Sequence, residues 1–332
     1  MATRWGIASA GKISHDFTNA LATLPPSEHE VVAVAARSLS RAQEFSKIHK
    51  IKKSYGSYEE LAKDSDIDIV YVGMLNPQHL EVSKLMLNNG KNVLCEKPLT
   101  MNAKETRELL AIAKEKNLFL MEAIWSRHFP LYDVIKKEIK SGSIGDVVQV
   151  IASFGFRMPN VERLNVKAQG GGTILDLGVY TIQFASLIFD GEKPLSIKAD
   201  GFLNDDGVDI SMSAILKYSN NRTAVLSTHS LANLPNEGVI IGTNGTIKIP
   251  NFWCPTTAEL PSGKIEFPLP KAPLDFNFIN SAGLRYEAME ARQCIKSGFK
   301  ESDKITHKES LLIAEIEDEI RRQIGVVYPQ DN

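Results

Sequence analysis

The stretch "GIASAGKISHDF", residues 6–17, decides the fold because it joins a short apolar run to a segment with helical spacing. Its turn reads Ser9-Ala10-Gly11-Lys12-Ile13-Ser14, where a dinucleotide-binding fingerprint would read G-x-G-x-x-G. Only the middle glycine, Gly11, is present, and it lets the backbone approach a pyrophosphate at a helix N-terminus. Serines take the other two places, which keeps close packing possible. The motif alone is weak, and a plain strand–helix connection is the alternative.

Outward from this turn, the first third of the chain alternates apolar strands with helices. Four further runs have strand character: "EVVAVAA", "DIVYVGM", "KNVLCE" and "LFLMEAI". A strand with no polar face is typical of a parallel sheet covered by helices on both sides. The alternation therefore predicts an α/β fold, with a doubly wound parallel Rossmann sheet over residues 1–124 that binds a nucleotide.

The pattern changes after residue 124. Strands dominate between about residues 195 and 270, and Asn244-Gly245 between "VIIGT" and "TIKIP" indicates a β-hairpin. The segment "ILDLGVYTIQFASLIF" favours a helix, preceded by "QGGGTI", which we expect to be flexible. Residues 125–332 are therefore predicted to form an α+β domain with a large, mainly antiparallel open sheet, for substrate binding and dimerisation.

Composition excludes several classes of protein. The chain has 332 residues, 43% hydrophobic and 23% charged, with a formal net charge of −2. A nucleic-acid-binding protein would usually carry a basic excess, and we expect neither nucleic-acid nor membrane binding. No secretory signal is evident, and the three scattered cysteines fit a reducing compartment, so we expect a cytoplasmic protein. No cluster of His, Cys, Asp and Glu has metal-ligand spacing, and we expect no metal.

The end of the second predicted strand indicates which coenzyme is bound. NAD-preferring sites usually place an acid there, which holds the ribose 2′-hydroxyl. This chain instead has Arg37, Ser38 and Arg41, and guanidinium and hydroxyl groups suit a 2′-phosphate. The pattern favours NADP; the alternative is a solvated helix start with two surface arginines.

Polar residues also follow the third and fourth long strands of the first domain. Glu96-Lys97-Pro98 ends one strand, while Leu75, Asn76 and His79 follow another. Ligands of open parallel sheets bind outside the carboxyl ends of the strands, so we expect these residues to line the coenzyme crevice. The proline restricts Lys97 to extended geometry, which aims its ammonium. The alternatives are a surface ion pair of Glu96 with Lys97 and an ordinary helix-start histidine.

Taken together, the motifs resemble those of a known family over nearly the whole chain. The spacing G-x-x-x-x-G at the first strand, "CEKP" at residues 95–98 and the α+β second half resemble the Gfo/Idh/MocA oxidoreductases. The segments "YGSYEELAKD", "LFLMEAIW", "LDLGVY" and "IGVVYPQD" are similar to the branch of dimeric animal dihydrodiol dehydrogenases, also known as NADP-dependent D-xylose dehydrogenases. The resemblance implies a homodimer, formed through the C-terminal sheet, that oxidises trans-dihydrodiols or D-xylose by hydride transfer to NADP.

The resemblance also directs attention to Asp176 and Tyr180. In a helix these residues share one face. Related sugar and inositol dehydrogenases typically carry a histidine where Tyr180 stands. A phenol has an ordinary pKa near ~10, so Tyr180 would need a nearby cation, such as Lys97, to act as a base. Asp176 would anchor a substrate hydroxyl or orient the lysine; the alternatives are a core tyrosine and a helix-start acid.

The substrate wall is predicted from aromatic and polar residues near strand ends. Each aromatic residue taken singly is more often part of a core than of a site. Two further functions stay open: another sugar or polyol dehydrogenase of the same family, and a protein that senses NADP without catalysis. The candidates for substrate contact, besides Asp176 and Tyr180, are Trp125, Arg127, Phe154 and Phe278.

Overall fold

The computed structural model describes all residues, 1–332, and divides the chain into two compact units. The division differs from the predicted one, 1–124 and 125–332, because a late segment, Leu269–His307, belongs to the first unit. A linear reading of the sequence places a boundary only where the pattern changes and does not detect such a return. The first unit comprises Met1–Leu99, Lys104–His128 and Leu269–His307, and the second comprises Thr100–Ala103, Phe129–Pro268 and Lys308–Asn332.

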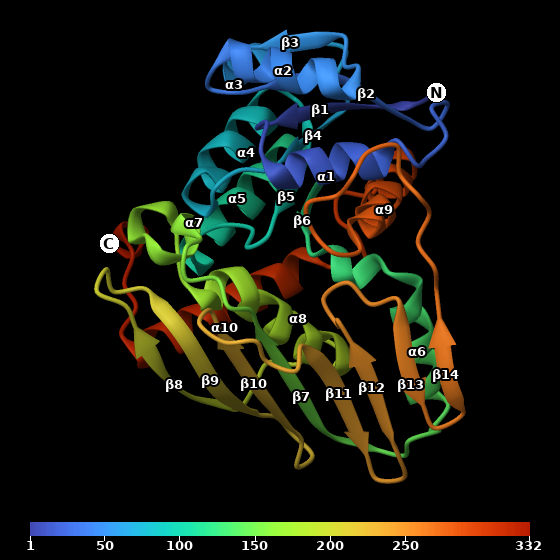
Figure 1. Cartoon of the computed structure of the whole chain (residues 1–332), viewed down its shortest axis with the longest axis vertical. Helices are drawn as coiled ribbons and strands as arrows, with labels where there is room; N and C mark the ends of the chain where they lie inside the picture. Colours follow the sequence, from blue (N-terminus) through green and yellow to red (C-terminus); the bar gives the residue numbers. More distant parts are fainter. The chain divides into compact units, whose positions relative to one another are not determined.

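The first unit confirms the predicted Rossmann fold. Its six parallel strands run in the order β3-β2-β1-β4-β5-β6, so the order reverses between β1 and β4. Helices cover both faces of the sheet (Figure 1). The strands are β1 (Thr3–Ala8), β2 (His29–Ala35), β3 (Lys53–Tyr55), β4 (Ile69–Val72), β5 (Asn92–Glu96) and β6 (Leu120–Ala123). The helices are α1 (Lys12–Leu21), α2 (Leu39–His49), α3 (Tyr58–Lys63), α4 (His79–Asn88), α5 (Ala103–Lys116) and α9 (Leu284–Lys296).

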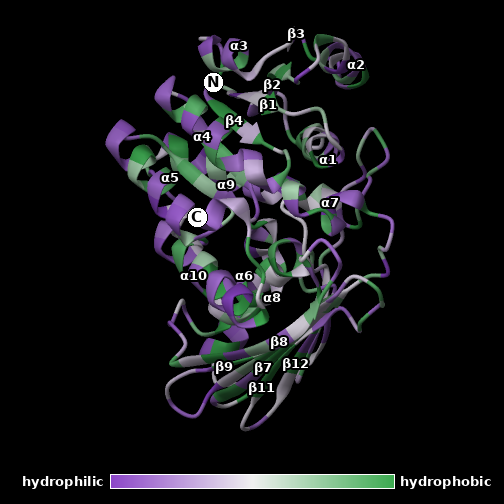
Figure 2. Cartoon of the chain, turned by 90° about the vertical axis from the view of Figure 1, so that its left-hand side faces the viewer, coloured by the Kyte–Doolittle hydropathy of each residue, from purple (hydrophilic) through white to green (hydrophobic).

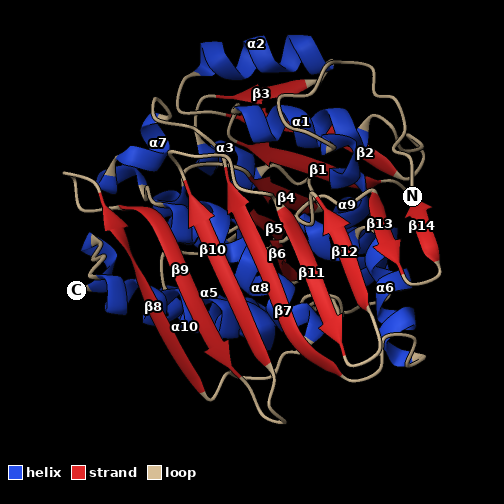
Figure 3. Cartoon of the chain, turned by 60° about the horizontal axis from the view of Figure 1, so that its bottom comes forward, coloured by secondary structure: helices blue, strands red, loops and turns tan.

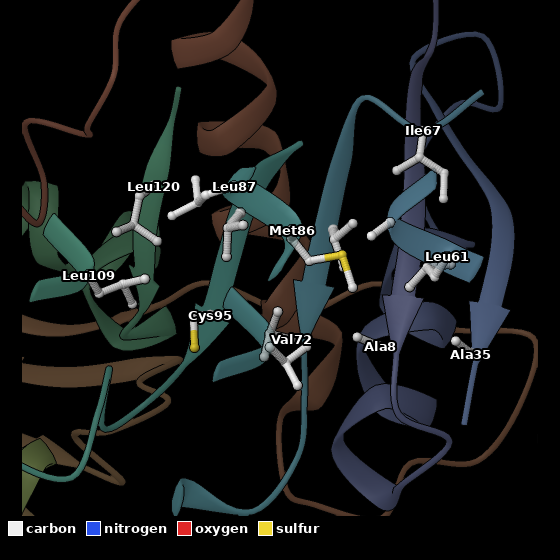
Figure 4. Close-up of a cluster of buried hydrophobic side chains, with 14 of the residues drawn as sticks. Ala8, Ala35, Leu61, Ile67, Val72, Met86, Leu87, Cys95, Leu109 and Leu120 are labelled. Atoms are coloured by element: carbon white, nitrogen blue, oxygen red, sulfur yellow. The ribbon is translucent and has the colours of Figure 1, made fainter. Parts of the chain in front are cut away.

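An apolar core on one face of this sheet fixes the strand ends. Short residues at the carboxyl ends of the strands, such as Ala8, Ala35 and Val72, pack with longer side chains from the helices (Figure 4). Burying such side chains contributes roughly 1.5–3 kcal/mol each for the larger ones. The residues labelled in Figure 4 are Ala8, Ala35, Leu61, Ile67, Val72, Met86, Leu87, Cys95, Leu109 and Leu120.

The second unit contains the predicted, mainly antiparallel sheet. Its order is β14-β13-β12-β11-β7-β10-β9-β8, with one parallel pair, β7 with β10. One face carries no helix of this unit, while α8 lies behind the other (Figure 3). The strands are β7 (Val147–Gly155), β8 (Ser196–Leu203), β9 (Asp209–Lys217), β10 (Thr223–His229), β11 (Glu237–Gly242), β12 (Thr246–Pro250), β13 (Thr257–Leu260) and β14 (Gly263–Glu266). The helices are α6 (Pro130–Lys140), α7 (Glu162–Asn165), α8 (Val179–Ile188) and α10 (His307–Ile324).

Local sequence patterns account for several of these elements. Apolar and polar residues alternate along the strands of the second sheet (Figure 2), as expected when one face is covered and the other is not. The hairpin predicted at Asn244-Gly245 joins β11 to β12. By length and composition the stretch Lys167–Ile188 could cross a membrane, but its most apolar window is 94% buried in the fold, as in the core helix of a soluble protein.

Candidate active site

In the first βα turn, serines occupy two of the three positions at which a complete motif would have glycine. Ser9 occupies the place of the first glycine and has a φ of 101°, a value that favours glycine. Ser14 occupies the place of the third, is fully buried, and donates its hydroxyl to the carbonyl of Gly73 at 3.3 Å. A Cβ at Gly73 would lie 2.6 Å from Tyr71 Cε1, so only glycine fits there.

This turn fits a coenzyme pyrophosphate. Gly11 precedes α1 with extended backbone and no side-chain cap, so the first amides of the helix are not satisfied by a capping side chain. The turn lies where the strand order reverses, the usual binding place in such sheets. Of the other predicted contacts in the turn, Ala10 and Ile13 are half-buried and Lys12 is exposed.

The end of β2 presents two guanidinium groups and no acid. Arg37 and Arg41 are exposed, and both act electrostatically on Tyr58. Burial raises the pKa of Tyr58, and the two arginines oppose this shift. Ser38 lies at the N-cap of α2, with its hydroxyl 2.8 Å from that of Ser40. This set of donors has the chemistry that a phosphate dianion needs.

Buried carboxylates hold the turn after β5. Glu96 is 7% exposed and accepts a hydrogen bond of 2.5 Å from the Tyr71 hydroxyl. Lys97 is half-buried, and its peptide bond to Pro98 is cis. The amide of Leu99 donates to the carboxylate of Glu122 at 2.9 Å. The amide of Lys97 itself donates to the Glu96 carboxylate at 3.3 Å, so two buried carboxylates hold the backbone of this turn.

His79 supports the same turn. The ring is completely buried, with Nδ1 2.8 Å from the carbonyl oxygen of Pro98 and Nε2 3.1 Å from that of Met74. Burial lowers the pKa of His79, which favours the neutral ring. The sequence predicts a coenzyme contact for His79; the structure places its ring nitrogens against backbone carbonyls. Leu75 and Asn76, also predicted to line the crevice, lie half-buried at this strand end.

Sequence reasoning missed a buried acid in the first unit. Glu287 of α9 is fully buried, and neither of its side-chain oxygens has a hydrogen-bond partner. Burial, and next the negative charge of Glu96, raise the pKa of Glu287. No sequence motif marks this residue.

In the second unit, Asp176 lies in a single π-helical turn, Ile174–Gly178, that leads into α8. Such turns are rare in proteins, and those that occur are often found at functional sites. The helix predicted over this stretch is present, and its first turn has π rather than α geometry. The Asp176 carboxylate is bound by Arg163 of α7, with Nη1 2.7 Å from Oδ1 and Nη2 3.3 Å from Oδ2. Arg163 was not identified from the sequence, because only the fold of the intervening loop brings it to Asp176.

The glycine segment "QGGGTI" before this turn, which the sequence predicts to be flexible, is packed against neighbouring backbone of the second unit. Gly170 to Gly172 are buried. The Gly172 amide donates to the carbonyl of Leu164 at 2.9 Å, and the Tyr328 hydroxyl donates to the carbonyl of Gly171. A Cβ at Gly171 would meet the Leu164 oxygen at 2.8 Å. These glycines permit close backbone packing.

Tyr180 belongs to an aromatic cluster. It is 7% exposed and packs edge-on against Phe154, with ring centroids 5.5 Å apart. Phe154 stacks on Trp253 at 4.2 Å and also contacts Phe156 and Phe252. Phe154 is predicted from the sequence, but Trp253 is not, because it follows β12 in a loop that carries no motif.

The remaining predicted substrate residues lie in the first unit. Trp125 and Arg127 are 6% and 3% exposed, in a short 3-10 helix, Trp125–His128. Arg127 NH1 donates to the backbone carbonyl of Lys304 at 3.2 Å. Phe278 is 43% exposed, in the loop before α9. No group of three or more His, Cys, Asp or Glu side chains could hold a metal ion.

Comparisons with known proteins agree with this arrangement. Residues 3–124 match the oxidoreductase family with an NAD-binding Rossmann fold, and residues 132–248 match the Gfo/Idh/MocA C-terminal domain. The chain is 52% identical over 333 residues to trans-1,2-dihydrobenzene-1,2-diol dehydrogenase of Danio rerio, covering 100% of both chains. It is 46% identical over 332 residues to the protein of that name from Homo sapiens, covering 100% of this chain and 99% of the relative.

Solved structures share the fold. A 3-ketoreductase from Actinomadura kijaniata, in complex with NADP and TDP-benzene, has a TM-score of 0.82 at 25% identity and covers 98% of each chain. A levoglucosan dehydrogenase in complex with NADH and levoglucosan has a TM-score of 0.85 at 19% identity, with the same coverage, and shows the fold alone. The chain has a Rossmann unit and the matching C-terminal domain, and it is similar to dehydrogenases over its full length. It is therefore a dehydrogenase that belongs to the Gfo/Idh/MocA oxidoreductase family.

Proposed function

We propose that this chain is an NADP-dependent dehydrogenase that oxidises trans-dihydrodiols of aromatic hydrocarbons (trans-1,2-dihydrobenzene-1,2-diol to catechol) and D-xylose at C1. The observation that carries the proposal is the aromatic cluster in which Phe154 packs against Tyr180 and stacks on Trp253. It places flat apolar rings next to a group able to take a proton, which suits a carbon-rich ring bearing hydroxyls. Full-length identity to relatives named for the dihydrodiol reaction supports the substrate class.

NADP is the proposed coenzyme. The Gly11 turn would hold its pyrophosphate, and Arg37, Ser38 and Arg41 would hold its 2′-phosphate. The NADP complex of the 3-ketoreductase supports this choice. When bound, the coenzyme accepts a hydride from the substrate carbon, and the chemistry left to the protein is placement and proton transfer.

The proposed catalytic groups are Lys97, Asp176 and Tyr180. Tyr180 takes the proton of the reacting hydroxyl while that carbon loses its hydride, and a carbonyl remains. Lys97 favours the ionised phenol and holds the substrate oxygen, while Asp176 accepts from a substrate hydroxyl. Variants of the 3-ketoreductase with one lysine or one tyrosine replaced have been solved. The number of residues between that lysine and that tyrosine is almost the same as the number between Lys97 and Tyr180 in this chain.

Substitution tests the catalytic assignment. We expect Lys97→Met and Tyr180→Phe each to lower kcat by about 10²–10⁴-fold, the usual contribution of a positioned proton donor or acceptor. NADPH binding, followed by its fluorescence, should remain measurable in both. Lys63→Met removes an exposed lysine of the same unit and should leave both quantities unchanged. Full activity of either catalytic variant would remove that residue from the mechanism.

A second experiment tests the coenzyme assignment. Arg37→Asp should raise the Kd for NADP relative to NAD by about 100-fold or more, because a carboxylate repels the 2′-phosphate and suits a 2′-hydroxyl. Lys47→Asp makes the same charge change at the other end of α2 and should leave the ratio close to that of the unaltered protein. An unchanged ratio in Arg37→Asp removes Arg37 from the coenzyme site.

A substrate panel separates this proposal from its alternatives. Dihydrodiols, D-xylose, other aldoses and polyols are offered with NADP to the purified protein. Turnover of other sugars or polyols alone indicates a different dehydrogenase of the same family. NADP binding without any turnover indicates a sensing protein.

We also propose a cytoplasmic homodimer. All three cysteines are buried free thiols, which suits a reducing compartment. The uncovered face of the second sheet carries exposed isoleucines, Ile151 and Ile215, and is the proposed contact between the two copies.

A further inference from the structure

Because Arg163 pairs with Asp176, the second unit presents a guanidinium together with a carboxylate to a substrate. Its two contacts, 2.7 and 3.3 Å, make a fork of two parallel bonds, the strongest way in which an arginine holds a carboxylate. The Asp176 side chain is 12% exposed and that of Arg163 is 40% exposed. Any polar group that reaches the carboxylate therefore meets the guanidinium as well.

The backbone around the pair is fixed in advance. On one side, the amide of Ile174 and the hydroxyl of Thr173 each donate to the buried Asp209 carboxylate at 2.7 Å. On the other side, Leu164 is buried and its carbonyl accepts the amide of Gly172. The pair is thus held from both ends by the second unit itself, as a binding group must be if it is to discriminate between ligands.

We infer that Arg163 and Asp176 together recognise the hydroxyl on the carbon next to the reacting one. That hydroxyl donates to the Asp176 carboxylate and accepts from the Arg163 guanidinium, since a hydroxyl can do both. The inference rests on the proposed function and narrows its substrate class to vicinal diols. It also links the two proposed substrates, because a trans-dihydrodiol and the C1–C2 end of an aldopyranose share two neighbouring hydroxyls.

The size of the preference follows from the pairing. A buried carboxylate with no partner would reject a substrate that lacks the hydroxyl very strongly. Asp176 keeps its bond to Arg163 in that case, so the penalty is smaller. We expect the site to favour a vicinal diol over the matching mono-alcohol by about 10- to 100-fold in kcat/KM.

The experiment compares two pairs of substrates with NADP: D-xylose with its 2-deoxy analogue, and trans-cyclohexane-1,2-diol with cyclohexanol. Arg163→Met should lower the diol preference about 10-fold, mainly by raising KM for the diol, with little change for the mono-alcohol. Arg163→Lys, which keeps the charge but not the fork, should lie between the two and remain folded. Arg157→Met removes an exposed arginine of the same unit and should keep the full preference.

The outcomes separate the inference from the proposed function. If Arg163→Met and Arg163→Lys slow both members of each pair alike, with the ratio unchanged, the pair has a purely structural role and the inference is overturned while the dehydrogenase stands. If the unaltered protein binds NADP but oxidises neither these four compounds nor trans-1,2-dihydrobenzene-1,2-diol, the proposed function fails and the inference with it. A ratio that falls while NADP binding is unchanged supports both.

Discussion

Among single residues, His128 should make the free energy of unfolding depend on pH. Both its ring nitrogens are buried without a hydrogen-bond partner. Burial, with the positive charges of Lys304 and Arg127, lowers its pKa from 6.5 to about 3. The unfolded chain therefore takes up a proton near pH 6.5, and the folded protein does so only near pH 3. The free energy of unfolding should fall as the pH is lowered through this window.

Replacing His128 isolates this contribution. We expect His128→Leu to lose stability less steeply below pH 6.5, with the two proteins diverging by about 1 kcal/mol per pH unit. At pH 7 the variant should be at least as stable, because leucine leaves no buried nitrogen without a partner. Urea unfolding at several pH values between 7 and 5 measures the difference. Parallel curves for the two proteins would contradict the assignment.

Single residues also show what the sequence can predict. Gly11, Arg37 and Lys97 follow strand ends, and the position of a strand end is itself legible from the apolar pattern. Arg163 and Trp253 carry no such mark, because their roles depend on which loop folds against which helix. Residues of this kind become visible only when the tertiary contacts are known.

Among the structural elements, the loop before α9 is fastened to the helix that follows the nucleotide turn. The buried carboxylate of Asp16 in α1 accepts from the amide of Asn277 at 2.9 Å, from its side-chain amide at 2.8 Å and from the amide of Phe278 at 3.0 Å. The Asn19 side chain adds two bonds to Leu274. The loop thus depends on α1 for its shape, although about 255 residues separate them in sequence.

Removing Asp16 should release this loop. We expect Asp16→Ala to lower the free energy of unfolding by about 2 kcal/mol, since three donors lose a charged acceptor. Hydrogen exchange of the amides of Asn277 and Phe278 should accelerate. Asp275→Ala, an exposed acid of the same loop, should leave both unchanged. Unaltered exchange at Asn277 and Phe278 in Asp16→Ala would refute the dependence.

The elements themselves were predicted unevenly. The sequence predicts the long apolar strands and the capped helices, because the spacing of their apolar residues is regular. Two features of the second half were not predicted. The π-helical turn at Asp176 differs from an α-helix by one inserted residue, which leaves no compositional trace. The segment Leu269–His307 belongs to the first unit through contacts such as those of Asp16, which no local pattern encodes.

In the molecule as a whole, the uncovered face of the second sheet is the surface that we propose for contact with a second copy of the chain. A row of β-branched residues crosses four neighbouring strands: Ile215 of β9 faces Val225 of β10, which faces Ile151 of β7, which faces Val239 of β11. The adjacent row, Ser213, Ser227 and Ser153, is small and leaves the apolar row accessible. Ile215 is 53% exposed, which is costly in an isolated chain and expected at an interface.

A charge at the centre of this face should prevent dimerisation. In a two-fold interface the same patch meets itself, so Val225→Lys places two ammonium groups in one desolvated contact. We expect the mass from light scattering to fall from twice the chain mass to 36.7 kDa at micromolar concentration. Val225→Thr keeps the β-branched shape and should remain dimeric, and Ile48→Lys, on the exposed side of α2, should as well. If Val225→Lys keeps the doubled mass, or the unaltered protein is monomeric, this face is not the contact between copies.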